Sequence, residues 1–286
     1  SRYPQAAFTA ARDLCLTTHT VQGPPEQLIV SDPDGVLATL TVGARTVTMR
    51  GPERTFVEQK RPFHDQFDRT TTDGWGMSPG GGNWSNSNGT DANYEVDGGG
   101  IIHMTADNAS RHTSVIDDIT DFDARLSWSL DVQPEGNASS LALSFAYSSS
   151  TSQYRARLSV LTTGVVQLVL ELQTSGGTTT LGSAVQLGTG YTAGDIWHIR
   201  AQRNGSNIRA RAWKDGDGEP TAWTHEVSDD TLGAGRIGVR GFASSGSTAV
   251  PFDFTVHDIQ LYSGRWEDPP TVTHSTWVRV LDQPFN

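Results

Sequence analysis

The chain has 286 residues, which is enough for one large β domain with appendages or for two domains, with a sizeable core. Its net charge of -11 and the lack of any basic run exclude nucleic acid as a partner, because phosphate binding needs clustered Lys and Arg. The single cysteine, Cys15, excludes an intrachain disulfide and a cysteine-based zinc site. No apolar run approaches the ~20 residues of a membrane span, so we expect no membrane insertion.

The first 62 residues predict a small β-rich segment that anchors the chain. Residues 28–30, 36–42 and 45–50 alternate in polarity as strands do. A segment of roughly sixty residues is near the lower limit for folding alone, so we expect it to lean on another part of the chain. The strand-like residues 265–286 are the expected partner, pairing with residues 28–56 into one small domain with a larger domain inserted between them.

That larger domain is predicted over residues 63–264 and begins with a long Gly, Ser and Asn-rich passage. The passage carries Trp75, Trp84 and Tyr94, and low-complexity linkers rarely hold such bulky rings. Two interpretations follow. The rings plug the open end of a β sandwich, or they form a loop-borne platform for sugars.

The rest of the domain consists of short runs with the two-residue period of strands that have one buried face. About a dozen strands and no convincing helix predict an all-β fold, a two-sheet antiparallel jelly-roll sandwich. Trp128, Trp197 and Trp223 are expected in its core. The predicted strands are 101–104, 113–119, 122–132, 141–147, 154–160, 165–172, 196–202, 207–213, 236–242 and 251–261.

The four runs between residues 154 and 213 predict an antiparallel meander with a core face and a polar face. Arginine donates to carboxylates and phosphates, and a tryptophan plane stacks on sugars, so neighbouring strands would make a positive row suited to an anionic wall polymer. The alternative is ordinary cross-strand charge pairing with Glu171, Asp123 and Asp131. The candidate glycan-binding residues on this face are Arg155, Arg157, Arg209, Arg211 and Trp213.

Several short motifs of the main domain belong together: Asp65-Gln-Phe-Asp-Arg-Thr70, Asp73-Gly-Trp-Gly76, Trp84, Tyr94-Glu-Val96, Tyr154-Arg-Ala-Arg-Leu158, Ile208-Arg-Ala-Arg-Ala-Trp213, Glu219-Pro-Thr-Ala-Trp223, Gly238-Val-Arg-Gly-Phe242 and Phe252-Asp-Phe254. In combination they resemble the concanavalin A-like, laminin-G-like domains in minor tail proteins of phages that infect actinobacteria. The flanking segments 44–56 and 272–281 resemble those that bracket such an insertion in related tail proteins.

The resemblance implies a virion tail component whose jelly roll sits at the adsorption end and touches host-envelope glycans. Its implied partners are other tail proteins, with an oligomeric state in the assembly, and a host cell-wall glycan. Two alternatives stay open. One is a purely structural tail-assembly protein without a ligand, and the other is a secreted bacterial carbohydrate-binding module.

A structural calcium ion is the one cofactor that the resemblance implies. Jelly-roll glycan-binding modules often hold such an ion between the first strand and an aspartate of the last, and Asp65 and Asp258 occupy similar places. Alternatively, Asp258 caps or pairs at a strand edge.

Catalytic motifs are missing from the sequence. It has no nucleophile elbow, no His-Glu-x-x-His and no phosphate loop. The nearest acidic pairs at a spacing of two, Asp121 with Asp123 and Glu95 with Asp97, lack the third acid of laminarinase-type glycosidases. In some related tail proteins a papain-like peptidase follows the jelly roll, but Cys15 lies before it, so that activity is not carried over. We therefore expect no enzyme.

Overall fold

The structure is a computed structural model that describes residues 19–20, 27–32, 35–43, 46–48 and 60–264. The chain divides into two compact units, one of Ser1–Phe56 with Glu267–Asn286 and one of Val57–Trp266. The predicted strand pairing of residues 265–286 involves residues outside the described ones.

The described strands of the first unit form one antiparallel sheet of four strands in the order β1-β4-β3-β2. Their bounds are β1 His19–Thr20, β2 Gln27–Asp32, β3 Gly35–Gly43 and β4 Thr46–Thr48.

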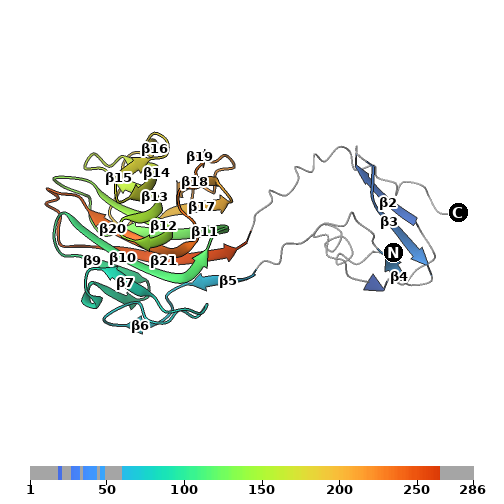
Figure 1. Ribbon diagram of the computed structural model, residues 1–286, viewed down its shortest axis with the longest axis horizontal. Coiled ribbons are helices and arrows are strands. Elements are labelled where there is room, and N and C mark those ends of the chain that lie inside the picture. The colour runs from blue at the N-terminus through green and yellow to red at the C-terminus, as the bar shows by residue number, and fades with distance from the viewer. Residues whose placement is uncertain (1–18, 21–26, 33–34, 44–45, 49–59, 265–286) are drawn as a thin grey trace. The chain divides into compact units, whose positions relative to one another are not determined.

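The second unit contains two antiparallel sheets and, within the described residues, one 3₁₀ turn, Asp91–Asn93 (Figure 1). No described helix is long and apolar enough to cross a membrane. The eight-stranded sheet has the order β15 Gly177–Thr180, β14 Val166–Thr174, β13 Ser152–Val160, β12 Ser139–Ser149, β20 Gly235–Ala243, β10 Ala109–Ile119 and β7 Ser85–Asn88, with β16 Val185–Gly188 also paired to β14. The nine-stranded sheet has the order β19 His225–Ser228, β18 Asn207–Lys214, β17 Trp197–Asn204, β11 Phe122–Leu130, β21 Phe252–Ser263, β9 Gly100–Met104, β8 Tyr94–Asp97 and β6 Thr70–Thr71, with β5 Lys60–Asp65 also paired to β21.

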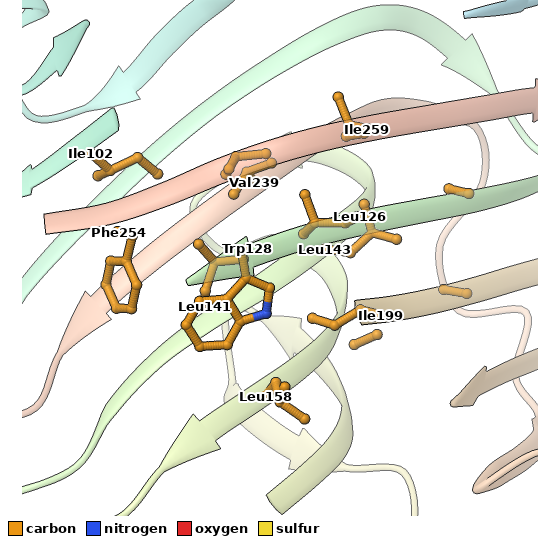
Figure 2. Packing of buried hydrophobic residues seen from close by; sticks show 14 of the residues in the cluster. Ile102, Leu126, Trp128, Leu141, Leu143, Leu158, Ile199, Val239, Phe254 and Ile259 are labelled. Atoms are coloured by element: carbon orange, nitrogen blue, oxygen red, sulfur yellow. The ribbon is translucent and has the colours of Figure 1, made fainter. Parts of the chain in front are cut away.

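One hydrophobic core lies between the two sheets. Leu126 and Trp128 of β11 belong to the same buried cluster as Leu141 and Leu143 of β12 and Val239 of β20 (Figure 2). The alternation of apolar and polar residues places these side chains on the inner faces of both sheets. The prediction of an all-β, antiparallel jelly-roll sandwich is confirmed.

The predicted four-stranded meander is wrong, because the chain changes sheet in the middle of it. β13 and β14 are neighbours in the eight-stranded sheet, whereas β17 and β18 are neighbours in the nine-stranded sheet. Between them the chain adds the short strands β15 and β16 to β14 and then crosses to the other layer. The two halves of the predicted polar face therefore lie on opposite outer surfaces of the sandwich.

The aromatic rings of the Gly-rich passage pack into the core. Trp75 and Tyr94 are fully buried, and Trp84 nearly so. Trp75 meets Phe67 edge-on at 5.0 Å and Trp84 at 4.8 Å between ring centroids. Burial of this kind fits the plug interpretation and leaves no ring face for a sugar platform.

Candidate functional site

The outer surface of the eight-stranded sheet carries a polar cluster that we call the arginine face, made of Arg155, Arg157, Glu171, Arg240 and His112. Arg157, Arg240 and His112 lie in one cross-strand row, separated by the small Ala142 between the first two. Since directly opposed residues share a face, their side chains emerge on the same side of the sheet.

Glu171 is the acidic centre of the arginine face. Its Oε2 lies 3.0 Å from Nη2 of Arg155, and its Oε1 accepts from Nη2 of Arg157 at 2.7 Å. Burial alone would raise the pKa of Glu171, but the hydrogen bonds and charges of Arg157 and Arg155 outweigh it and lower that pKa. This part of the face matches the predicted cross-strand charge pairing for two of the five candidate residues.

Arg240 is the cation of the arginine face that has no carboxylate within ion-pair distance among the described residues. Its Nε donates to Oγ of Ser110 at 3.0 Å, and its guanidinium lies 4.7 Å from the ring centroid of Phe242. Burial, and then the charge of Arg155, lowers the pKa of Arg240 to about 10. The protein thus holds a cation here in a place that disfavours its charge.

His112 closes the row as a neutral side chain that is 1% exposed. It stacks on Tyr147 at 3.9 Å, with Nδ1 2.7 Å from Oγ of Ser87 and Nε2 2.7 Å from Oγ of Ser144. Burial, and then the charge of Arg240, lowers the pKa of His112 to about 3. It therefore adds hydrogen-bonding capacity to the face but no charge near neutral pH.

Some buried polar atoms around this face have no hydrogen-bond partner within the described protein. They are Oγ of Ser114, Nε of Arg155, Oε1 of Gln153 and Oε2 of Glu171, on residues that are at most 5% exposed. Buried polar groups are normally satisfied, so each such atom calls for an explanation. Ordered water or a ligand with hydroxyl groups provides one.

Arg209, Arg211 and Trp213 occupy the outer surface of the other sheet, in what we call the Trp223 cluster. The half-buried Trp223 ring lies 4.2 Å from the guanidinium carbon of Arg211 and 4.6 Å from that of Arg209. The prediction that Trp223 belongs to the core is wrong, whereas Trp128 and Trp197 are in the core. Cation-π contacts with strand arginines hold the ring on the surface instead.

Three arginines of the Trp223 cluster, Arg125, Arg200 and Arg211, stand directly opposite one another on β11, β17 and β18. Opposed like charges destabilise a sheet, and Glu219 offsets this by pairing with all three, at 2.8 Å from Arg125 and 2.6 Å from Arg200. Asp123 also pairs with Arg200, whose Nε donates to Oδ1 of Asp123 at 2.9 Å. The charges of this row are largely compensated within the protein.

Trp213 lies at one end of the Trp223 cluster. Its ring stacks on His198 at 5.0 Å and an interplanar angle of 12°, and Nε2 of His198 is 2.9 Å from Oδ1 of Asp215. The predicted single row of arginines and tryptophan is therefore split. Arg155 and Arg157 face one way, and Arg209, Arg211 and Trp213 face the other.

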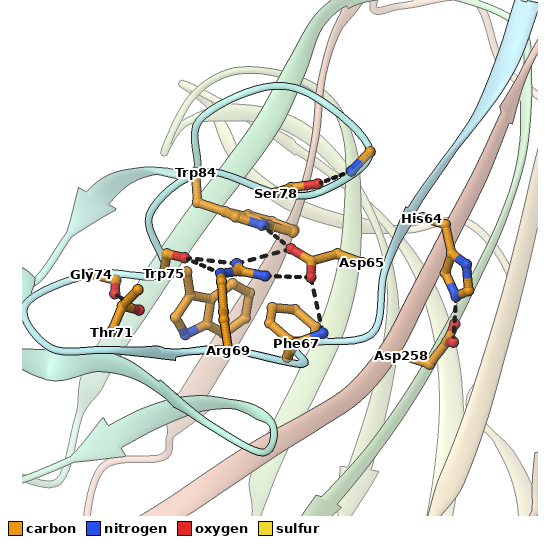
Figure 3. A network of polar contacts seen from close by, with 11 residues as sticks. His64, Asp65, Phe67, Arg69, Thr71, Gly74, Trp75, Ser78, Trp84 and Asp258 are labelled. Carbon is orange, nitrogen blue, oxygen red and sulfur yellow. Dashed lines mark hydrogen bonds and ion pairs between the residues drawn. The ribbon is translucent and has the colours of Figure 1, made fainter.

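Asp65 and Asp258 do not fit a calcium site. The fully buried Asp65 carboxylate accepts from Nη1 of Arg69 at 2.6 Å, Nε1 of Trp84 at 2.8 Å and the Phe67 amide at 2.9 Å (Figure 3). Asp65 on β5 stands opposite Ile259 on β21, so the neighbouring residue Asp258 points to the other side of the sheet. There, Oδ2 of Asp258 lies 2.7 Å from Nε2 of His64.

A carboxylate surrounded by nitrogen donors lacks the oxygen ligands that calcium requires. Among the described residues no group of three or more His, Cys, Asp or Glu residues could hold a metal ion.

Sequence reasoning missed Arg240 and His112, although a signal for the first was present. Arg236, Gly238, Arg240 and Phe242 alternate with apolar residues, which puts Arg240 on an outer face. What the sequence does not contain is the pairing of that strand with β12, which brings Arg240 into the row of Arg157.

The chain matches no protein-family model and no curated protein. Among solved structures it is similar to a carbohydrate-binding module of Bacillus subtilis, at 12% identity over 63% of this chain and 95% of that one, with a TM-score of 0.46. It is also similar to the catalytic domain of a laminarinase from Thermotoga petrophila, at 13% identity over 73% and 99%, with a TM-score of 0.49. A third similar structure is a pseudo β-1,3-glucanase of Mycobacterium tuberculosis. Its identity is 13% over 71% of this chain and 98% of that one, with a TM-score of 0.46. These similarities concern the fold.

The expectation that the chain is not an enzyme is corrected by these comparisons. Glycoside hydrolases are among the similar structures, together with a carbohydrate-binding module and a pseudo β-1,3-glucanase.

Proposed function

We propose that the jelly roll is the host-binding domain of a phage minor tail protein and that its arginine face binds a glycan of the host cell surface. The observation that carries the proposal is the group of buried hydrogen-bonding side chains on an outer sheet surface, with atoms of Ser114, Arg155 and Gln153 unsatisfied. Unsatisfied buried polar groups cost free energy, and sugar hydroxyls offer the donors and acceptors that would satisfy them.

The tail assignment is supported by the sequence motifs over residues 63–264 and by the flanking segments that resemble tail proteins. In this proposal residues 1–62 and 265–286 join the chain to other tail proteins, in an oligomeric assembly within the virion. The jelly roll then faces the host.

The test is binding of the full-length chain to purified cell walls of an actinobacterial host, measured by co-sedimentation. Arg157→Ala should weaken binding about ten-fold or more, the size expected for one charged hydrogen bond, while Glu171 keeps Arg155 as its partner. Arg125→Ala is the matched control, because it removes the same charge from the opposite outer surface.

Release of reducing sugars in the same samples measures hydrolysis. A folded wild-type chain that binds no wall fraction would refute the proposal and favour a purely structural tail role. Detection of the native chain in purified virions supports the tail assignment, whereas its presence only in bacterial culture medium would favour a secreted carbohydrate-binding module.

A further inference from the structure

We infer, building on the proposed function, that the glycan carries a carboxylate or phosphate group and that this group binds between Arg240 and Arg157. These two arginines would select the charged class of ligand.

The arginine face has three cations and one anion. Glu171 pairs with Arg155 and Arg157, and its Oε2 has no hydrogen-bond partner among the described residues. Arg240 has no carboxylate within ion-pair distance in the described part of the chain. The Trp223 cluster shows the contrast, since Glu219 and Asp123 hold its aligned arginines. On a protein with a net charge of -11, the surplus of positive charge on the arginine face is local and specific.

The spacing suits one oxyanion held from two sides. Arg157 and Arg240 oppose the same residue, Ala142, from the two neighbouring strands, so their Cα atoms are about 10 Å apart. Between them the sheet presents only the small side chain of Ala142, and the next row, opposite Arg155, holds the small Ser144 and the bare Gly238. Arg157 donates to Glu171 and Ser159 on one side of this strip, and Arg240 donates to Ser110 on the other. A carboxylate or phosphate, which guanidinium groups bind in a bidentate manner, would draw the two side chains toward each other over the strip.

The energetics point the same way. Burial and neighbouring arginines disfavour the charge of Arg240, and an anion at this place would offset that cost. His112 stays neutral beside Arg240 and uses both ring nitrogens on Ser87 and Ser144, so it neither competes for the anion nor repels it.

The experiment measures binding of the full-length chain by calorimetry to three probes: trigalacturonic acid, its neutral methyl ester and mannose 6-phosphate. At least one charged probe should bind, with an affinity that falls as salt is added. If the protein recognises the carboxylate, the ester should bind at least ten-fold more weakly than the acid. Binding of mannose 6-phosphate alone would assign the group as a phosphate.

The selecting residue is tested with Arg240→Ala, which should weaken binding of the charged probe about ten- to a hundred-fold. Arg240→Gln keeps hydrogen-bonding capacity without the charge and guards against misfolding, and Arg125→Ala should bind as the wild type does. Equal binding of acid and ester, or no binding of either charged probe, would overturn the inference. Wall binding that persists in that case leaves the proposed function standing, so the two failures are distinguishable.

Discussion

His112 should make the jelly roll less stable in mild acid. Its pKa is about 3 in the folded state because the ring is buried beside Arg240, whereas an unfolded histidine titrates near 6.5. The unfolded chain therefore takes up a proton as the pH falls below about 6.5, and the folded chain does not, so the free energy of unfolding decreases. At about 1.4 kcal/mol per pH unit, the loss at pH 5 is about 2 kcal/mol.

The assay is urea unfolding followed by circular dichroism at pH 7 and pH 5. His112→Gln should start from a lower stability at pH 7 and lose about 2 kcal/mol less than the wild type on acidification. His257→Gln is the matched control. Burial also lowers the pKa of His257, but this ring is half-buried and should account for a smaller part of the slope. An unchanged pH slope in His112→Gln would show that the ring is charged in the folded protein or open to solvent.

Three further substitutions test the buried Asp65 network, the Glu219 bridge of the Trp223 cluster and the strand packing at Gly238. Asp65→Asn removes the fully buried charge that the half-buried Arg69 pairs with and should cost about 3–5 kcal/mol, measured as a lower Tm; an unchanged Tm would contradict the described network. Glu219→Gln leaves opposed arginines uncompensated and should cost about 1–3 kcal/mol and expose the loop 215–224 to proteolysis; resistance equal to the wild type would count against the bridge. Gly238→Ala places a Cβ against the carbonyl oxygen of Thr113 and should cost about 1–3 kcal/mol in urea unfolding, and a neutral effect would mean that the strands separate readily there.

The fold could be predicted from the sequence because one local rule determines most of it. Alternation with a period of two identifies strands and their buried faces, and the inner residues of β13 and β18, such as Leu158 and Ile208, are in the core as expected. The rule contains no information on which strand is the neighbour. The runs that follow one another from residue 154 to 213 read as one meander, yet the crossing after β16 places them in two sheets.

The candidate site could be predicted only in part for the same reason. Arg155 and Arg157 were placed on an outer face correctly, and their pairing with Glu171 follows from adjacent strands joined by a short turn. Arg240 lies some eighty residues further along the chain, and only the long-range pairing of β20 with β12 brings it beside them. Trp223 was misplaced because aromatic character predicts burial, whereas its actual partners are the arginines of β17 and β18.

The two arginine-rich surfaces show that residue type alone does not identify a binding site. Both have arginines in aligned cross-strand rows, which by residue type would suit an anionic glycan equally well. What separates them is the supply of carboxylates. Glu219 reaches back from the loop after β18 to neutralise one row, and no described carboxylate does the same for Arg240. Because partial burial of a cation without a counterion lowers stability, the half-buried Arg240 is better explained by a ligand than by the fold.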